Sequence, residues 1–160
     1  MNTTQTLIRL RDLKLGGMAA ALEQQQSQPG TYDDLPFTER LELLLDREYL
    51  NRDHRKQERL IRQARFKLQA AIHDIDYQHP RNLKKIQVAR LAGTDWLEKG
   101  QNLLITGPCG SGKTYLACAI GHQACLNGLS ARYYRLSRLL LELTQAKADG
   151  SYHKLLSQLL

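Results

Sequence analysis

Apolar and polar positions along the first part of the chain follow helical periods. Apolar side chains recur at roughly helical spacing through residues 4–28 (Leu7, Leu10, Leu13, Met18 and Leu22). We expect a helix there that bends or breaks at Gly16-Gly17, because paired glycines relax the backbone. The Ser-Gln-Pro-Gly sequence at 27–30 is expected to end it. A second helix is predicted to begin after Pro36, with Thr38 as its cap, and to run to about Leu68 or beyond.

Farther along the chain a turn is expected at His79-Pro80. The pattern of apolar positions then changes, because short apolar runs occur at residues 102–106 (Asn-Leu-Leu-Ile-Thr) and 131–136. Runs of this kind are typical of buried parallel strands. Five helical segments are expected around these two runs, within residues 73–90, 93–100, 111–127, 138–147 and 152–160.

The alternation of these elements predicts the fold class and the domains. We expect an α/β protein with an N-terminal helical arm over residues 1–72. Residues 73–160 are expected to form a second domain, the first part of a parallel sheet with flanking helices. The boundary is placed between about Gln69 and Asp76.

Residues 107–114 carry the clearest chemical signal. They read Gly-Pro-Cys-Gly-Ser-Gly-Lys-Thr and fit the pattern G-x-x-x-x-G-K-[ST] at every position, between a predicted strand and a predicted helix. Glycines let backbone N–H groups reach phosphate oxygens without a Cβ clash, and the helix N-terminus adds partial positive charge. The lysine can reach terminal phosphates, and the Thr hydroxyl can ligate Mg²⁺. We therefore predict ATP and Mg²⁺ as ligands, with Thr114 on the metal and with the nucleotide held by Gly107, Pro108, Cys109, Gly110, Ser111, Gly112, Lys113 and Thr114.

No residue is assigned a catalytic role. Hydrolysis by a P-loop protein needs an acidic residue that holds magnesium and polarises water. No apolar strand that ends in Asp or Glu follows residue 136, and Asp74 and Asp76 precede the loop. We expect ATP hydrolysis by these 160 residues to be absent or very slow.

Positive charge gathers in the second predicted helix. The chain has 23 Lys and Arg against 16 Asp and Glu, and residues 47–67 alone hold eight basic residues against three acidic ones. Steps of three and four place several of them on one helical face. Such a face suits successive phosphates of a DNA duplex, although a solvated face with pairs such as Glu58–Arg62 explains the charge equally well. The predicted DNA contacts are Arg52, Arg55, Lys56, Arg59 and Arg62, and the helical arm of residues 1–72 is expected to bind DNA or a partner.

The remaining composition concerns the compartment. The three cysteines form no CxxC pair, which favours reduced thiols. The N-terminus lacks an apolar signal segment, and no run approaches the roughly 20 apolar residues of a membrane span. We expect a cytoplasmic protein with no membrane partner.

Taken together, these residues resemble the IstB-like family of AAA+ ATPases, the helper ATPases of insertion-sequence transposition, which are related to DnaC-type helicase loaders. The similarity extends beyond the P-loop and keeps its order along nearly the whole chain. The segments that carry it are residues 13–19 (LKLGGMA), 37–40, 62–66 (RQARF), 95–98 (DWLE), 103–117 (LLITGPCGSGKTYLA) and 146–155 (AKADGSYHKL).

The resemblance implies a function beyond nucleotide binding. It implies an ATPase that assembles into homo-oligomers on double-stranded DNA and recruits a transposase, with Gly107, Gly110, Gly112, Lys113 and Thr114 at the Walker A positions. The family's Walker B acids, sensor residue and arginine finger have no counterpart in the 160 residues. We therefore expect residues 73–160 to be an incomplete P-loop ATPase domain, truncated after its second strand. Two alternatives remain open: a helicase-loader module of DNA replication, and an inactive remnant that only binds nucleotide.

Overall fold

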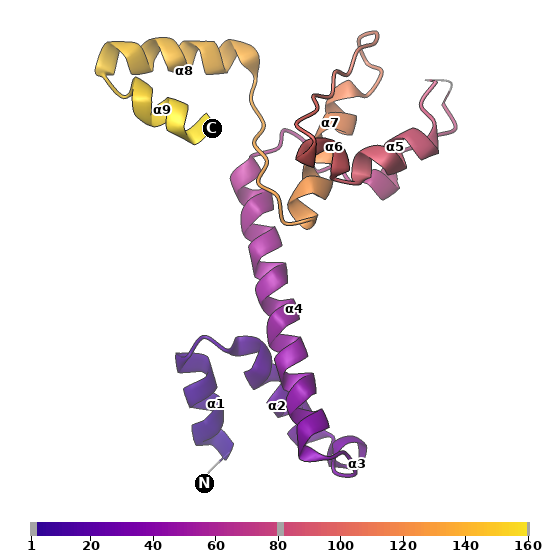
Figure 1. The fold of residues 1–160 in the computed structure, drawn as a ribbon, viewed down its shortest axis with the longest axis vertical. Coiled ribbons are helices and arrows are strands. Elements are labelled where there is room, and N and C mark those ends of the chain that lie inside the picture. Colours follow the sequence, from indigo (N-terminus) through magenta and orange to yellow (C-terminus); the bar gives the residue numbers. More distant parts are fainter. Residues whose placement is uncertain (1–2, 80–81, 160) are drawn as a thin grey trace. The chain divides into compact units, whose positions relative to one another are not determined.

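The structure is a computed structural model that describes residues 3–79 and 82–159. It divides into two compact units, Met1–Leu60 and Ile61–Leu160, which are described separately below. Figure 1 shows that both are built from helices. The division falls near the end of one long helix, whereas the predicted domain boundary at residues 72 and 73 stays a prediction. Part of the predicted His79-Pro80 turn lies outside the described residues.

The first unit is helical, as its sequence pattern predicts. Its elements are α1 (Thr3–Asp12), α2 (Gly16–Ser27), the short α3 (Pro29–Tyr32) and α4 (Phe37–Ala64). The break predicted at Gly16-Gly17 is confirmed and lies just before the pair, between Asp12 and Gly16, whereas α3 was not predicted. Thr38 lies inside α4 rather than at its cap, because the carbonyl of Pro36 already accepts a hydrogen bond from the Arg40 N–H.

A close approach of α2 to α4 explains one of the paired glycines. A Cβ built on Gly17 would lie 2.6 Å from the Arg47 carbonyl oxygen and 2.7 Å from the Glu48 Cα, so only glycine fits there. Further along α2, the Gln25 side-chain amide donates to the Arg40 carbonyl at 3.0 Å. Because the two contacts occur in opposite order along the helices, α2 and α4 are antiparallel.

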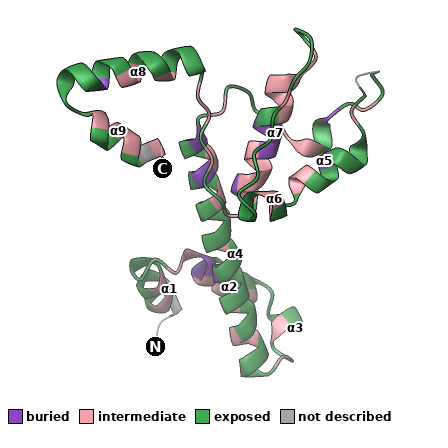
Figure 2. Cartoon of the chain, turned by 45° about the horizontal axis from the view of Figure 1, so that its top comes forward, coloured by how far each residue is buried: buried purple, intermediate pink, exposed green. Residues whose placement is uncertain are grey.

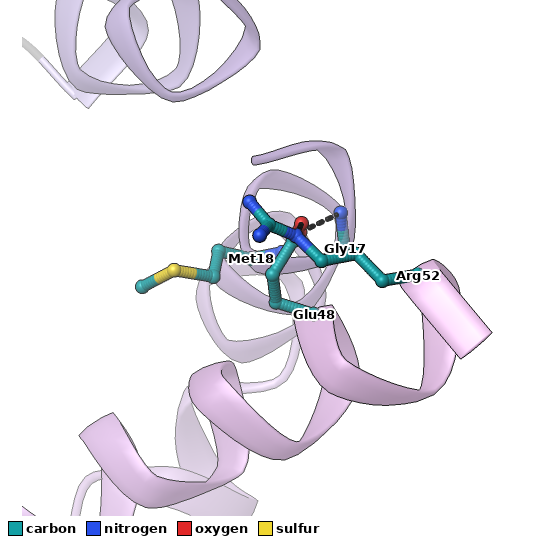
Figure 3. Close-up of polar contacts among 4 residues, drawn as sticks. All are labelled: Gly17, Met18, Glu48 and Arg52. Carbon is teal, nitrogen blue, oxygen red and sulfur yellow. Dashed lines mark hydrogen bonds and ion pairs between the residues drawn. The ribbon is translucent and has the colours of Figure 1, made fainter. Parts of the chain in front are cut away.

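A buried carboxylate fastens this contact. Glu48 of α4 is 6% exposed, and its Oε2 accepts hydrogen bonds from the Gly17 N–H at 2.8 Å and the Met18 N–H at 3.2 Å. Its Oε1 pairs with Arg52 Nε at 2.7 Å (Figure 3). Gly17 and Met18 open the first turn of α2, where N–H groups have no partner within the helix. Glu48 therefore caps α2 from the neighbouring helix.

The second unit carries the remaining helices. They are the 3₁₀ turn η1 (Ile72–Asp74), α5 (Lys85–Ala92), α6 (Asp95–Glu98), α7 (Lys113–Leu126), α8 (Leu136–Asp149) and α9 (Tyr152–Leu159). Its buried core joins the chain after α4 to α5 and α7 through Ala70, Ile75, Val88, Cys118 and Ala119, and Figure 2 shows buried positions on α7. The predicted helices around Trp96, after the P-loop and at both C-terminal segments are confirmed.

The α/β prediction, with its parallel sheet, is wrong. The described residues contain no strand: segments 102–106 and 131–135, where strands were predicted, have no regular secondary structure. An extended run becomes a strand only when a neighbouring strand accepts and donates its backbone hydrogen bonds. Leu104 is 86% exposed, and the Tyr133 N–H donates instead to the carbonyl of Ala64 at the end of α4. The apolar pattern indicated two strands, but it could not supply the pairing that a strand requires.

Candidate nucleotide site and basic helix face

The loop before α7 has the backbone that its glycines predict. Gly107, Gly110 and Gly112 have φ angles of 152°, 80° and 88°, in the region that side chains with a Cβ disfavour. A Cβ at Gly107 would also lie 3.2 Å from Ser111 Oγ. The loop therefore needs glycine for its conformation at all three positions.

The first turn of α7 offers uncapped donors. Its N-cap is Gly112, which has no side chain to accept a hydrogen bond from the helix. The first backbone bond at this end joins the Leu116 N–H to the Gly112 carbonyl at 3.0 Å. Within the described part of the chain, the N–H groups of Lys113, Thr114 and Tyr115 have no acceptor. These donors and the positive end of the helix dipole make this turn suited to an anion.

Lys113 places its charge against the same loop. Its Nζ donates to the carbonyl oxygens of Gly107 at 2.8 Å and Pro108 at 2.6 Å, so the side chain folds back over the loop. An ammonium group has three N–H donors, and these two contacts leave one for another acceptor. The positive side chain and the uncapped backbone donors thus belong to one short segment.

An open cavity of about 920 Å³ adjoins the loop. Gly107, Pro108, Ser111, Gly112 and Lys113 line it on one side. Its other walls are largely apolar and include Leu91, Trp96, Leu103, Ile105 and Leu116. No Asp or Glu is among its described lining residues. A cavity of this size, with a polar loop at one side and apolar walls at the other, is typical of small-molecule sites.

Some lining residues were missed by sequence reasoning. Trp96 lies on α6, and its indole Nε1 donates to the Leu91 carbonyl at 3.1 Å, which fixes the ring beside the end of α5. Arg90 of α5 also lines the cavity. The signals in the sequence were their position shortly before the apolar run that leads into the loop and, for Trp96, its place in the DWLE segment that carries the family resemblance.

The cysteines and the threonine in and after the loop differ in exposure. Cys109 is an exposed free thiol, whereas Cys118 and Cys125 on α7 are buried. Burial raises the pKa of the Cys125 thiol, although a backbone hydrogen bond at Ala131 acts in the opposite direction. Thr114 is half-buried at the second position of α7. No group of three or more His, Cys, Asp or Glu that could hold a metal ion occurs in the described ranges.

The basic residues of α4 share a face, as predicted. At about 100° per residue, Arg52, Arg55, Arg59 and Arg62 span about 80° of the helix circumference, and Lys56 widens this to about 120°. All five are exposed. We call this set the α4 basic face.

The ion pairs of α4 test the alternative that this face is solvated and that its charges are paired within the helix. Arg52 forms an ion pair with Glu48. Glu58, the partner of Arg62 in that alternative, instead contacts His54 at 3.7 Å. Among the described residues, no acidic partner is recorded for Arg55, Arg59 or Arg62, so their charge is open to an external anion.

In the part of the chain that the structure describes, no helix combines the length and apolar character required to cross a bilayer.

Comparison with known proteins identifies a family of similar sequences. The family model described as "IstB-like ATP binding protein" matches residues 8–160. A Pseudomonas fluorescens protein, named for ATP binding in insertion sequence IS1162, is 49% identical over 160 residues, which are 99% of this chain and 69% of that protein. An insertion-sequence protein of Sinorhizobium fredii, also named for ATP binding, is 41% identical over 94% of this chain and 61% of its own length. One from Mycobacterium tuberculosis is 34% identical over 89% of this chain and 57% of its own length. The chain thus spans about three fifths to two thirds of the length of these relatives.

Proposed function

Because the chain belongs to the family of IstB-like ATP-binding proteins of insertion sequences, we propose that it acts as an ATP-dependent, DNA-binding helper of transposition. Family membership implies nucleotide binding. The finer steps proposed here are that residues 107–114 hold the phosphates of ATP with Mg²⁺, that the α4 basic face meets double-stranded DNA, and that the protein works with a transposase.

One observation carries the nucleotide part of the proposal. The first turn of α7 presents N–H groups without acceptors, and Lys113 Nζ lies against the same loop. This donor set fits the oxygens of a polyphosphate, and the Thr114 hydroxyl at the start of the helix suits a magnesium ion held by those phosphates. The adjoining cavity, with Trp96 and Leu91 in its walls, offers apolar surface for the base of the nucleotide.

The DNA part of the proposal rests on the α4 basic face. Its arginines repeat every three or four residues along an uninterrupted helix of 28 residues. Contacts of this kind neutralise phosphates and position a protein on a duplex without reading its sequence. The names of the relatives, which associate them with insertion sequences, support a role in DNA transposition. Recruitment of a transposase and assembly into a homo-oligomer on the DNA complete the proposed role.

Calorimetric titration with Mg²⁺-ATP tests the proposal. Lys113→Ala should remove most of the affinity, because Lys113 is the point charge that the loop directs at the terminal phosphates. Lys85→Ala on α5 is the matched control, since it removes an equal charge from an exposed position that does not line the cavity. Equal affinities in Lys113→Ala and the unmodified protein would refute the assignment of the loop. Titrating with ATP in the presence of a chelator instead of Mg²⁺ tests the metal, and an unchanged affinity would argue against it.

A further inference from the structure

A second concentration of positive charge lies in the second unit, away from the P-loop cavity. A groove of about 500 Å³ is lined by residues of the chain just after α4, of the segment before α8, of α8 itself and of α9. Its basic residues are Arg65, Lys67, Arg132, Arg135 and Arg138, which we call the basic groove. None of them belongs to the predicted P-loop or to the α4 basic face.

A backbone contact builds this groove. The Tyr133 N–H donates to the carbonyl of Ala64 at 2.8 Å, and Ala64 is the last residue of α4. The final carbonyls of a helix lack partners within the helix, so this bond satisfies one of them. It also holds the segment that carries Arg132 and Arg135 beside the segment that carries Arg65 and Lys67. Residues nearly 70 positions apart in sequence are thereby brought to one groove.

The charge of the groove is largely uncompensated. Glu142 is the acidic residue among its lining side chains, and it pairs with Arg138 at 3.1 Å. Arg132 Nη1 donates to the Tyr134 hydroxyl at 3.3 Å, which orients the guanidinium but does not neutralise it. Among the described residues no acidic partner is recorded for Arg65, Lys67, Arg132 or Arg135. Like charges held in one concave surface repel one another, and bound anions relieve that repulsion.

Arg65 gives an independent reason to look for a ligand. It follows the last residue of α4 and has a φ of 52°, the left-handed conformation that usually falls to glycine or asparagine after a helix. An arginine there is strained by its Cβ. Arg65 lines the groove with the other basic residues, so it supplies a positive charge at a position where the backbone alone favours glycine.

We propose that the basic groove binds the phosphate backbone of DNA, as a second contact besides the α4 basic face. This inference rests on the DNA-binding role proposed above and adds a site to it. A groove of this volume holds one or two phosphate groups rather than a duplex, so the backbone passes over it while the arginines contact phosphate oxygens. Binding here is indifferent to base sequence and weakens with salt.

The test measures duplex affinity by fluorescence anisotropy at several salt concentrations. Arg132→Gln combined with Arg135→Gln should flatten the log–log salt slope by up to about 2 units, since each phosphate contact contributes about 0.9. The matched control, Lys85→Gln with Lys99→Gln, removes two charges from exposed positions of the same unit outside the groove. It should leave the slope nearly unchanged.

Two single substitutions separate charge from folding. Arg65→Gly relieves the left-handed backbone, so it should not lower the urea midpoint, yet it should flatten the slope by about 1 unit. Glu142→Gln releases Arg138 and should raise DNA affinity. Glu98→Gln, which removes an exposed acid outside the groove, should raise it less.

The outcomes distinguish this site from the proposed function. If the groove variants and their controls have the same salt slope as the unmodified protein while substitutions on α4 flatten it, the proposal of DNA binding at the basic groove is refuted and DNA binding by α4 stands. If only the groove variants flatten the slope, the groove is supported and the α4 assignment fails. If the unmodified protein does not bind duplex DNA, both fail together.

Discussion

The contact of Glu48 with α2 gives the sharpest prediction about stability. Glu48 accepts two backbone hydrogen bonds and one from a guanidinium while it is buried. Removing one partner of a hydrogen bond to a charged group costs about 1.5–3 kcal/mol. In Glu48→Gln one amide oxygen remains to accept a bond, but the charge is lost and the new NH₂ meets groups that themselves donate. We expect a loss of about 2–3 kcal/mol in the free energy of unfolding, or roughly 10–20 °C in Tm for a unit of this size.

Ionisation of Glu48 adds a pH dependence with a defined sign. Burial raises its pKa, but the hydrogen bonds from Arg52, Met18 and Gly17 and the charge of Arg52 outweigh burial and hold the pKa below its ordinary value of 4.5. A depressed pKa in the folded state contributes stability that is fully present above the unfolded value. The advantage of the unmodified protein over Glu48→Gln should therefore shrink as the pH falls from 4.5 through the lower folded pKa.

The assay combines thermal unfolding with amide exchange. Far-UV circular dichroism follows all helices, whereas the emission of Trp96, the one tryptophan of the chain, reports the second unit. Glu42→Gln is the control, because it makes the same change at an exposed position of α4 that has no ion pair within the described part of the chain. Exchange at the amides of Gly17 and Met18 should speed up only in Glu48→Gln. If the two variants melt at the same temperature and exchange equally, the capping argument is wrong.

The other predictions concern DNA, the loop thiol and core packing. Replacing Arg55, Arg59 and Arg62 by Ala should flatten the salt slope of duplex binding by up to about 3 units. Arg52 is kept in this variant so that Glu48 retains its ion-pair partner. An unchanged slope would mean that this face of α4 is only solvated. Cys109 should react with a thiol reagent far faster than the buried Cys118 and Cys125. Mg²⁺-ATP should slow the reaction of Cys109, and a labelling rate that does not change with ATP would contradict nucleotide binding at the loop. Gly121→Ala should cost about 1–3 kcal/mol in a urea titration, because overpacking is destabilising. The added Cβ would lie 2.7 Å from the Phe66 ring, whereas Gly30→Ala, with no atom within 4 Å, should be nearly neutral.

Sequence reasoning worked where the pattern is local. Helical periodicity located α1, α2 and α4, and the glycine spacing of residues 107–114 predicted the backbone that Gly110 and Gly112 adopt. These features depend on neighbours along the chain, so the sequence contains them. The same is true of the α4 basic face, which follows from the step of three and four residues alone.

Sequence reasoning failed where the outcome depends on a distant partner. The run at residues 102–106 is apolar enough for a buried strand, but burial and pairing require other segments, and Leu104 is exposed in the structure. The interaction of Gly17 with Glu48 joins residues 31 positions apart, and the basic groove joins segments still farther apart. No periodicity encodes such contacts. The glycine pair was correctly predicted as a helix break, but its role in close packing came only from the structure.

One face of α4 shows why periodicity leaves function undecided. Leu41, Leu44 and Glu48 recur at steps of three and four, and Arg52 and Arg55 continue the same row. The first three are half-buried or buried, whereas the arginines are exposed. Along this row the side chains therefore change from packed to exposed and charged between Glu48 and Arg52, which lie one helical turn apart and form an ion pair. Because that pair fixes the Arg52 guanidinium, the cap on α2 and the start of the α4 basic face depend on a single carboxylate. A substitution at Glu48 should consequently affect DNA affinity through Arg52 as well as stability through α2.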